Sequence, residues 1–162
     1  MIRGIHHTAI STVDLERSLA FYRDLLGFEP VLDFSWPEGT ANMNATHRLK
    51  QTAGRVVLLR AGNAMIELFQ YATPAPRPAD AERRLCDHGI THFCIDVDDI
   101  DAEYARLSAG GMEFHCPPVD YGTVKTTYGR DPDGNVIELQ EILSPDDPLA
   151  LEVQKAAAAE SA

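Results

Sequence analysis

The stretch HTAISTVDLERSLAFYRDLLGF, residues 7–28, has a counterpart later in the chain in HFCIDVDDIDAEYARLSAGGMEF, residues 92–114. Aligning the histidines that begin these stretches also aligns the aspartates Asp14 and Asp99. Each copy predicts a short strand, an aspartate that caps a helix, and a helix that ends at glycine. A repeat of this kind indicates two similar units that bury a core only by pairing.

A second repeated motif closes each half of the chain. GNAMIELFQ, residues 62–70, resembles GNVIELQE, residues 134–141, and each is a Gly-Asn turn followed by a strand. Side chains alternate along a strand, so Glu67 and Glu138 lie on the face opposite to the aliphatic residues beside them. Each half therefore reads strand–helix–strands, with a histidine in its first strand and a glutamate in its last, which predicts an α+β fold.

The two halves set the expected domain organisation. The insertion in the first half has no clear period and is expected to form a loop or a short helix. A Pro- and Ala-rich connector indicates the linker between the halves. The last segment begins with helix-start residues and ends in alanines, which predicts a peripheral helix with a frayed tail. The expected parts are a first unit at 1–72 with its insertion at 33–54, a linker at 73–84, a second unit at 85–143, and a C-terminal helix and tail at 144–162.

Composition excludes several classes of partner. The 162 residues carry a net charge of −11, which argues against nucleic acid or an anionic membrane surface as a partner. No apolar run approaches the roughly 20 residues that span a bilayer, and MIRGIHH at the start lacks the layout of a secretory signal. Three cysteines without a CxxC motif suit a reducing compartment better than a disulfide scaffold, so the sequence predicts a cytoplasmic protein.

Four polar residues are placed symmetrically by the repeat: His7, Glu67, His92 and Glu138. Taken singly, a histidine or glutamate on a half-buried strand is most often a hydrogen-bonded structural residue. Two carboxylates buried together repel each other unless a cation lies between them, and neutral imidazoles complete the coordination of such a cation. If the two sheets curl into one trough, the four side chains converge there, so the sequence predicts a divalent metal centre.

These motifs, together with IELFQY at residues 66–71 and YGRDPDGNVIELQE at residues 128–141, resemble the vicinal oxygen chelate superfamily. The resemblance covers residues 2–142 and implies two tandem βαβββ modules that form a cupped mixed sheet around a metal site, with the helices outside, commonly in a homodimer. The implied cofactor is one divalent ion of zinc, nickel, cobalt, manganese or iron. The ligands that the resemblance implies are His7, Glu67, His92 and Glu138.

Within this superfamily, the ligand set resembles that of metal-dependent lyases and isomerases of the glyoxalase and epimerase kind. Such enzymes bind a small oxygenated substrate and move a proton next to its metal-chelated carbonyl through an enediolate. The resemblance implies Glu67 and Glu138 as the acid–base groups. The substrate stays open, because FQYATPAP at residues 69–76 departs from the glyoxalase pattern and methylmalonyl-CoA epimerases usually carry glutamine where Glu67 stands.

Two alternatives belong to the same superfamily. An extradiol dioxygenase would use a two-histidine, one-carboxylate iron site at His7, His92 and Glu138, and Tyr128 matches its pattern. However, DYGTVKTT at residues 120–127 lacks the acid–base histidine of that family, and Glu67 would fill a position that oxygen chemistry keeps open. A bleomycin-resistance-like protein would instead bind a ligand without metal, but such members typically lack the ligand set.

Five further residues are predicted to contact the substrate. Lys125 and Tyr128 lie on a strand before the second Gly-Asn turn, where the alternative is a polar strand face. Trp36, His47 and Arg48 lie in the long insertion, which either forms a lid over the site or is a loop packed by its own side chains. The expected partner is therefore a small molecule, with no nucleic acid and no membrane.

Overall fold

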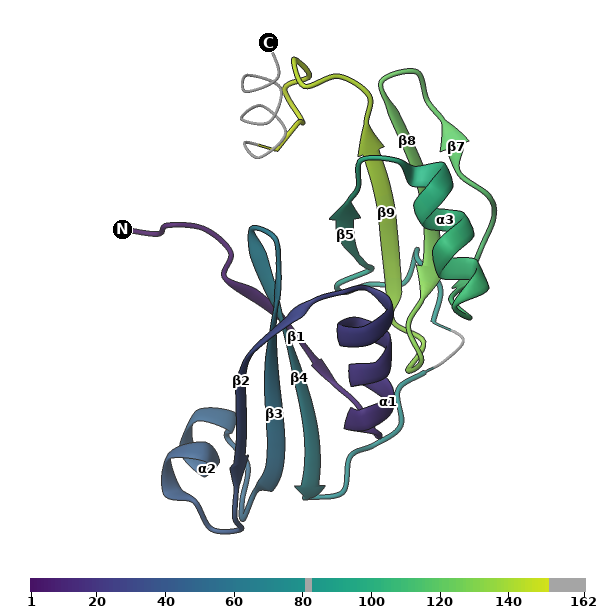
Figure 1. The fold of residues 1–162 in the computed structure, drawn as a ribbon. Coiled ribbons are helices and arrows are strands. Elements are labelled where there is room, and N and C mark those ends of the chain that lie inside the picture. Colours follow the sequence, from purple (N-terminus) through teal and green to yellow (C-terminus); the bar gives the residue numbers. More distant parts are fainter. Residues whose placement is uncertain (81–82, 152–162) are drawn as a thin grey trace. The chain divides into compact units, whose positions relative to one another are not determined.

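A computed structural model describes residues 1–80 and 83–151 of the chain (Figure 1). The chain forms two compact units, Met1–Glu82 and Arg83–Ala162, whose boundary lies within the linker expected at 73–84. Within the described residues, no helix is long and apolar enough to cross a membrane.

The C-terminal segment differs from the helix expected at 144–162. Residues 144–151 form turns and bends, and the remainder of the expected helix lies outside the described residues. Pro145 and Pro148 account for the turns, because proline donates no backbone hydrogen bond and disfavours a helical residue before it.

The first unit consists of β1 (His7–Ser11), α1 (Leu15–Leu19), η1 (Ala20–Leu25), β2 (Glu29–Trp36), α2 (Ala41–His47), β3 (Ala53–Ala61) and β4 (Ala64–Thr73). Its strands form one mixed sheet in the order β1-β4-β3-β2. Strand β1 is parallel to β4, and the other neighbouring strands are antiparallel. This is the expected βαβββ arrangement, with α2 inserted between its second and third strands.

The first helix begins and ends as the sequence predicts. The Asp14 side chain accepts a hydrogen bond from the backbone N–H of Arg17, so it caps α1. Leu15, Leu19 and Tyr22 are buried at 1%, 2% and 0% exposure and form the apolar side of this helix. The last turns widen into the π-helical segment η1. Gly27 follows with a φ of +78°, a conformation that glycine adopts without strain.

The insertion expected at 33–54 is shorter than predicted, because strands extend into both of its ends. Strand β2 continues to Trp36 and β3 begins at Ala53, which leaves α2 and its flanking turns as the insertion. The Trp36 ring lies directly over Gly54, where an added Cβ would come within 2.8 Å of the ring and 2.5 Å of the Gln70 carbonyl oxygen. The close packing of indole on backbone therefore requires glycine at this position.

The second unit consists of β5 (Phe93–Asp96), α3 (Ile100–Ala109), β6 (Glu113–Phe114), β7 (Val119–Asp120), β8 (Val124–Arg130) and β9 (Val136–Ile142). Its sheet has the order β5-β9-β8-β6, with β7 also paired to β8. Strand β5 is parallel to β9, as β1 is to β4 in the first unit. The Asp99 side chain accepts from the backbone N–H of Ala102 and caps α3, as predicted.

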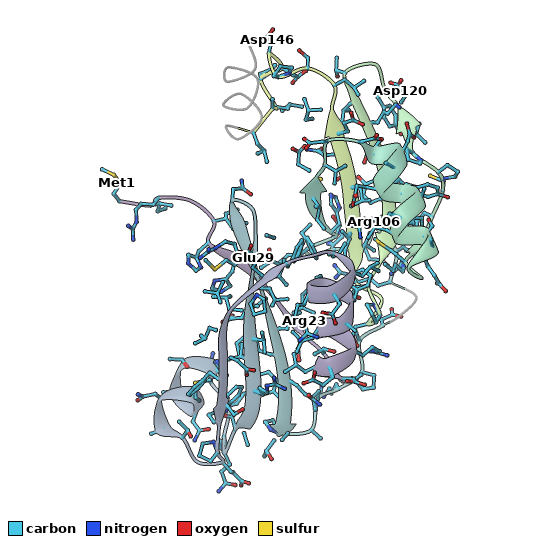
Figure 2. The ribbon with its side chains drawn as sticks, viewed as in Figure 1. Met1, Arg23, Glu29, Arg106, Asp120 and Asp146 are labelled. Carbon is cyan, nitrogen blue, oxygen red and sulfur yellow. The ribbon has the colours of Figure 1, made fainter. Side chains whose placement is uncertain are left out.

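Each sheet buries aliphatic side chains on one face and carries its glutamate on the other. Ile66 and Leu68 of β4 are buried, as are Ile137 and Leu139 of β9. The helices of each unit contact these last strands. Figure 2 labels Arg23 on the first helix and Arg106 on α3; each forms an ion pair with an acidic residue of its own helix. The glutamates of β4 and β9 lie on the opposite face, because side chains alternate along a strand.

Candidate metal centre

The first unit brings His7 and Glu67 together. His7 begins β1, and its Nε2 lies 3.3 Å from Oε2 of Glu67 on β4. The parallel register pairs His7 with Met65 and Ala9 with Glu67, so the histidine and the glutamate share one face of the sheet. The glutamate side chain is 20% exposed.

The second unit repeats the arrangement with His92 and Glu138. The Nε2 atom of His92 lies 3.0 Å from Oε2 of Glu138, whose side chain is 14% exposed. Cys94, two residues after the histidine, pairs with the glutamate, as Ala9 does in the first unit. The same register therefore produces the same pair in both units.

The orientation of His92 suits a metal ligand. Its Nδ1 atom lies 2.9 Å from the Thr91 hydroxyl oxygen. If Nδ1 carries the proton and donates to that oxygen, the lone pair of Nε2 remains available on the side of Glu138. Metal-binding histidines are usually oriented in this way by a partner on their other nitrogen. In the first unit, Nδ1 of His7 lies 2.9 Å from Nδ1 of His6.

Three further side chains surround Glu138. The Thr126 hydroxyl donates to Glu138 Oε1 at 2.7 Å and also lies 2.9 Å from the Leu139 carbonyl oxygen. Burial and a hydrogen bond to Glu138 raise the pKa of the Tyr128 phenol to about 12. Burial of the thiol and the Glu138 carboxylate raise the pKa of Cys94 to about 12. At neutral pH these groups are therefore protonated hydrogen-bond donors.

Tyr128 also lies between two imidazoles. Its ring meets that of His92 edge-on, with the centroids 5.2 Å apart, and stacks with that of His115 at 6.5 Å. The backbone N–H of His115 donates to the Tyr128 carbonyl oxygen, which holds the two residues side by side. Tyr128, predicted as a substrate contact, thus belongs to the immediate surroundings of the second pair.

The donor chemistry of the pairs fits a divalent cation. Two ligands at right angles, each about 2.1 Å from an ion, are about 3.0 Å apart, and the nitrogen–oxygen separations of the two pairs are close to this value. Each unit supplies one imidazole and one carboxylate. Within residues 1–80 and 83–151, no group of three or more His, Cys, Asp or Glu side chains gathers as a complete site. Each pair is therefore half of the predicted ligand set.

Trp36 and His47 lie in an aromatic cluster on the Glu67 face of the first sheet. Phe69 and Tyr71 follow Glu67 at two-residue intervals along β4, and the rings of both contact those of Trp36 and His47. The Tyr71 hydroxyl lies 3.0 Å from His47 Nδ1. Trp36 is 3% exposed and donates from Nε1 to the Thr52 hydroxyl. The cluster thus holds α2 against the sheet beside the first pair.

The other two predicted substrate contacts are not brought beside a His–Glu pair. Arg48 is exposed and ends α2 in the left-handed conformation, with a φ of 52°. Lys125 lies on the α3 side of the second sheet, where its Nζ is 2.7 Å from the Asp101 carboxylate. The register explains this position, because Lys125 pairs with Glu141 whereas Tyr128 pairs with Glu138 on the opposite face.

The sequence reasoning missed Thr91, Cys94 and Thr126. A signal for Thr126 was present, since it lies two residues before Tyr128 and therefore shares its face of β8. Cys94 is likewise two residues after His92. What the sequence lacked was the register that places both beside Glu138.

A surface pocket of about 560 Å³ lies next to the first pair. Its lining includes Arg3, Arg60 and His6, together with Met65, the residue that pairs with His7. Two of the lining residues are arginines, in a chain of net charge −11. Their positive charge favours an anionic group near the pocket.

Asp96 is a destabilised carboxylate on the same face as Glu138. Burial, followed by the charge of Asp98, raises its pKa, and a hydrogen bond from Gln140 opposes the shift. Among the described residues, its Oδ1 atom is buried without a hydrogen-bond partner. The folded state therefore binds a proton at Asp96 more readily than the unfolded state does.

Replacing Asp96 with asparagine is expected to raise the free energy of unfolding at pH 7, because the substitution removes an unfavourable buried charge. The wild type regains that stability as the pH falls and Asp96 takes up a proton. The difference in the free energy of unfolding between Asp96→Asn and the wild type should therefore be largest at pH values above the raised pKa of Asp96. It should vanish below pH 3.8, the ordinary pKa of an aspartate. Urea denaturation at several pH values measures it, and a loss of stability at pH 7 would contradict the prediction.

Comparison with known proteins gives the family. Residues 4–139 match the Glyoxalase/Bleomycin resistance protein/Dioxygenase superfamily. The uncharacterized protein YaeR of Escherichia coli is 33% identical over 141 residues, which are 86% of this chain and 97% of YaeR. A lactoylglutathione lyase of Neisseria meningitidis is 26% identical over 146 residues, covering 89% of this chain and 94% of the lyase.

A solved structure agrees with the fold. The crystal structure of a glyoxalase family protein from Bacillus cereus has a TM-score of 0.78 at 21% identity, covering 89% of this chain and 97% of that protein. The fold, the repeated motifs and the sequence match agree with one another. The chain is a member of the glyoxalase, bleomycin-resistance and dioxygenase superfamily, also called the vicinal oxygen chelate superfamily.

Proposed function

We propose that this protein is a metal-dependent lyase or isomerase, epimerase-like or glyoxalase-like, that moves a proton next to a carbonyl of a small oxygenated substrate. The observation that carries the proposal is the His–Glu pair, repeated in both units with one register. Similarity to lactoylglutathione lyase at 26% identity supports the reaction class.

The two pairs would hold the metal through His7, Glu67, His92 and Glu138. A bound divalent cation supplies a Lewis acid that polarises the carbonyl and acidifies the adjacent C–H bond. The imidazoles act only as ligands. The carboxylates of Glu67 and Glu138 are the groups that accept the proton from carbon and return it, since a carboxylate is a suitable base for such a carbon acid.

Neighbouring residues would bind the rest of the substrate. The aromatic cluster around Trp36 and His47 offers an apolar wall on the Glu67 face. Arg60, in the pocket beside His6, offers a cation for an anionic substituent. We therefore favour a substrate that combines an α-hydroxy carbonyl or an acyl thioester with a negatively charged group.

Hydrogen exchange with solvent tests the proposal. Protein purified without chelators and loaded with zinc, nickel, cobalt, manganese or iron(II) is incubated in D2O with hemithioacetals, α-hydroxy ketones and acyl thioesters. We expect proton NMR to show loss of the signal of the hydrogen next to the carbonyl, and we expect no loss with the double variant Glu67→Gln/Glu138→Gln. A protein that binds metal yet exchanges none of these hydrogens would contradict the proposal.

A second candidate function is an extradiol dioxygenase. One observation favours it: the His115 ring stacks on the Tyr128 ring. A histidine therefore lies beside the tyrosine, although residues 120–127, which directly precede it, contain none. Oxygen uptake by the iron(II)-loaded protein with catechols would identify this activity. Exchange without oxygen uptake would identify the lyase or isomerase.

We also propose that the protein works as a homodimer in the cytoplasm. Each unit supplies only two of the four ligands, which suits an assembly in which units pair. The three cysteines are free, as expected in a reducing compartment. Light scattering at micromolar concentration should give twice the chain mass of 17.8 kDa.

A further inference from the structure

The pocket beside the first His–Glu pair is lined by basic residues and by no acidic one. Residues 2–6, which include Arg3 and His6, form one side of it, and Arg60 of β3 lines it together with the turn between β3 and β4 (Figure 1). The backbone N–H of Met65 donates to the His6 carbonyl oxygen at 3.1 Å, which ties the two sides together. Among the described residues that line the pocket, none is aspartate or glutamate. The chain has 25 acidic residues against 14 basic ones, so a lining without a carboxylate departs from its composition.

The two arginines of the pocket differ from other arginines of the first unit. Arg23 and Arg55 form ion pairs with carboxylates at 2.7 Å. Within residues 1–80 and 83–151, the side chains of Arg3 and Arg60 form no ion pair and no hydrogen bond. A guanidinium carries several N–H donors and no acceptor. The donors of Arg3 and Arg60 are therefore available to a bound anion.

The internal repeat provides a comparison for Arg60. Arg60 of β3 and Arg130 of β8 are equivalent, because each pairs with the residue two positions before the glutamate of its unit. The Arg130 guanidinium donates to two backbone carbonyl oxygens, that of Gly134 at 2.6 Å and that of Arg83 at 3.1 Å. Arg130 therefore stabilises the turn before β9. Arg60 has no such acceptor within the described residues, so the same position is open in the first unit.

From these observations we infer that Arg3 and Arg60 form a binding site for an anionic oxygen group, a carboxylate or a phosphate, and that this group belongs to the substrate. The assignment to the substrate rests on the proposed function, whereas binding of the anion does not. Arginine suits such a group because its planar guanidinium donates to two oxygens at once. A local pair of cations is needed here, since a net charge of −11 repels anions from the chain as a whole.

The register places this site near the proposed metal ligands. Arg60 and His7 pair with Met65 from its two sides, so all three residues share the face of the sheet that carries Glu67. Neighbouring strands are about 4.8 Å apart, so the Cα atoms of Arg60 and His7 are about 10 Å apart. One small molecule can therefore contact the arginine and a metal ion held by His7. The substrate class that fits is a short α-hydroxy ketone with a phosphate or carboxylate a few bonds from its carbonyl.

His6 connects the pocket with the first His–Glu pair. It lines the pocket, and its Nδ1 lies 2.9 Å from Nδ1 of His7. If His7 binds a metal through Nε2, its Nδ1 carries the proton and donates to His6. A neutral His6 then carries its own proton on Nε2, so it adds an N–H donor to those of the two arginines.

Anion binding is measured directly on protein from which metal has been removed with a chelator, so that the anion does not bind a metal ion instead. Inorganic phosphate and malonate are titrated into 15N-labelled protein, and NMR follows the Nε–H signals of the arginines. We expect saturable shifts of the Arg3 and Arg60 signals. Saturation by phosphate alone identifies a phosphate site, and saturation by malonate alone identifies a carboxylate site.

Three variants test the residues. We expect Arg60→Met to weaken binding of the anion by about 10-fold or more, and Arg60→Lys, which keeps the charge, to weaken it less. Arg3→Met should weaken it by about threefold or more, and it changes an exposed residue outside the sheet. Circular dichroism checks that each variant folds. If Arg60→Met does not fold, Arg60→Lys and Arg3→Met decide the question.

Arg23→Met is the matched control. Arg23 lies on η1 of the same unit with its side chain 41% exposed, and the substitution removes the same charge. Binding of the anion should stay within about twofold of the wild type. The inference is overturned if the wild type shows no saturable binding of either anion. It is also overturned if the folded Arg60 and Arg3 variants bind the anion as tightly as Arg23→Met does.

Matched substrates test the assignment of the anion to the substrate. In the D2O assay with metal-loaded protein, we expect dihydroxyacetone phosphate to have a KM about 10-fold or more below that of dihydroxyacetone. Arg60→Met should raise the KM for the phosphate ester and leave that for dihydroxyacetone unchanged. Equal KM values in the wild type would overturn the assignment. Protein that binds phosphate or malonate but exchanges no hydrogen refutes the proposed function and leaves the anion site in place. Exchange by a protein that binds neither anion upholds the proposed function and refutes the site.

Discussion

Replacement of His92 with alanine is expected to weaken binding of a divalent cation by about a thousandfold, or about 4 kcal/mol. The imidazole lies 3.0 Å from Glu138 and its other nitrogen contacts Thr91, so its removal deletes a proposed ligand and the contact of that ligand with the carboxylate. Proton exchange should disappear with the metal. Competition between the protein and a chromophoric chelator measures the affinity, and elemental analysis measures occupancy after purification.

His88→Ala is the matched control for this prediction. His88 is an exposed residue of the same unit, four positions earlier, and its backbone carbonyl oxygen accepts a hydrogen bond from the Arg83 guanidinium. We expect metal affinity within about twofold of wild type for the control. If His92→Ala binds metal as the wild type does, the His–Glu pairs are ordinary ion pairs and the metal centre is refuted.

Replacement of Leu68 with alanine is expected to lower the free energy of unfolding of the first unit by about 3–4 kcal/mol. Leu68 is fully buried on the helix side of β4, and its strand neighbours Val57 and Ile10 are buried at 2% and 7% exposure. Truncation removes the transfer free energy of three carbons and leaves a cavity that rigid strands do not fill. Such a loss is a large part of the stability of a typical domain.

Trp36 provides the measurement, since it is the chain's one tryptophan and is buried in the first unit. Urea denaturation followed by its fluorescence reports this unit. Leu32→Ala on β2 is the matched control, because the side chain is 50% exposed and its truncation should cost less than about 1 kcal/mol. Equal losses from the two variants would show that the helix side of the sheet is not the core that stabilises the unit.

The sequence alone predicted the repeated unit and its helix caps because those signals are local. The interval from His7 to Asp14 recurs from His92 to Asp99, and both aspartates accept the expected backbone hydrogen bonds. The alternation of side chains along β4 and β9 correctly predicted that the glutamates lie on the face opposite to the buried aliphatic residues. The same rule places Lys125 and Tyr128, which are three residues apart, on opposite faces of β8. Applied to Lys125, it would have excluded this residue from the predicted site.

The sequence did not predict which residues are neighbours across adjacent strands. The neighbours of Glu138 come from β5 and β8, and Trp36 reaches Phe69 only because β2, β3 and β4 align in one register. Register depends on the combined packing of distant segments, and a slip of one residue would turn every side chain to the other face. The sequence therefore determined which residues share one face of a strand, because side chains alternate with a period of two along it. Tertiary structure decided which of them meet, and so placed the Thr126 hydroxyl, Cys94 and Tyr128 beside Glu138 and aliphatic residues beside Glu67, because those contacts depend on long-range strand pairing.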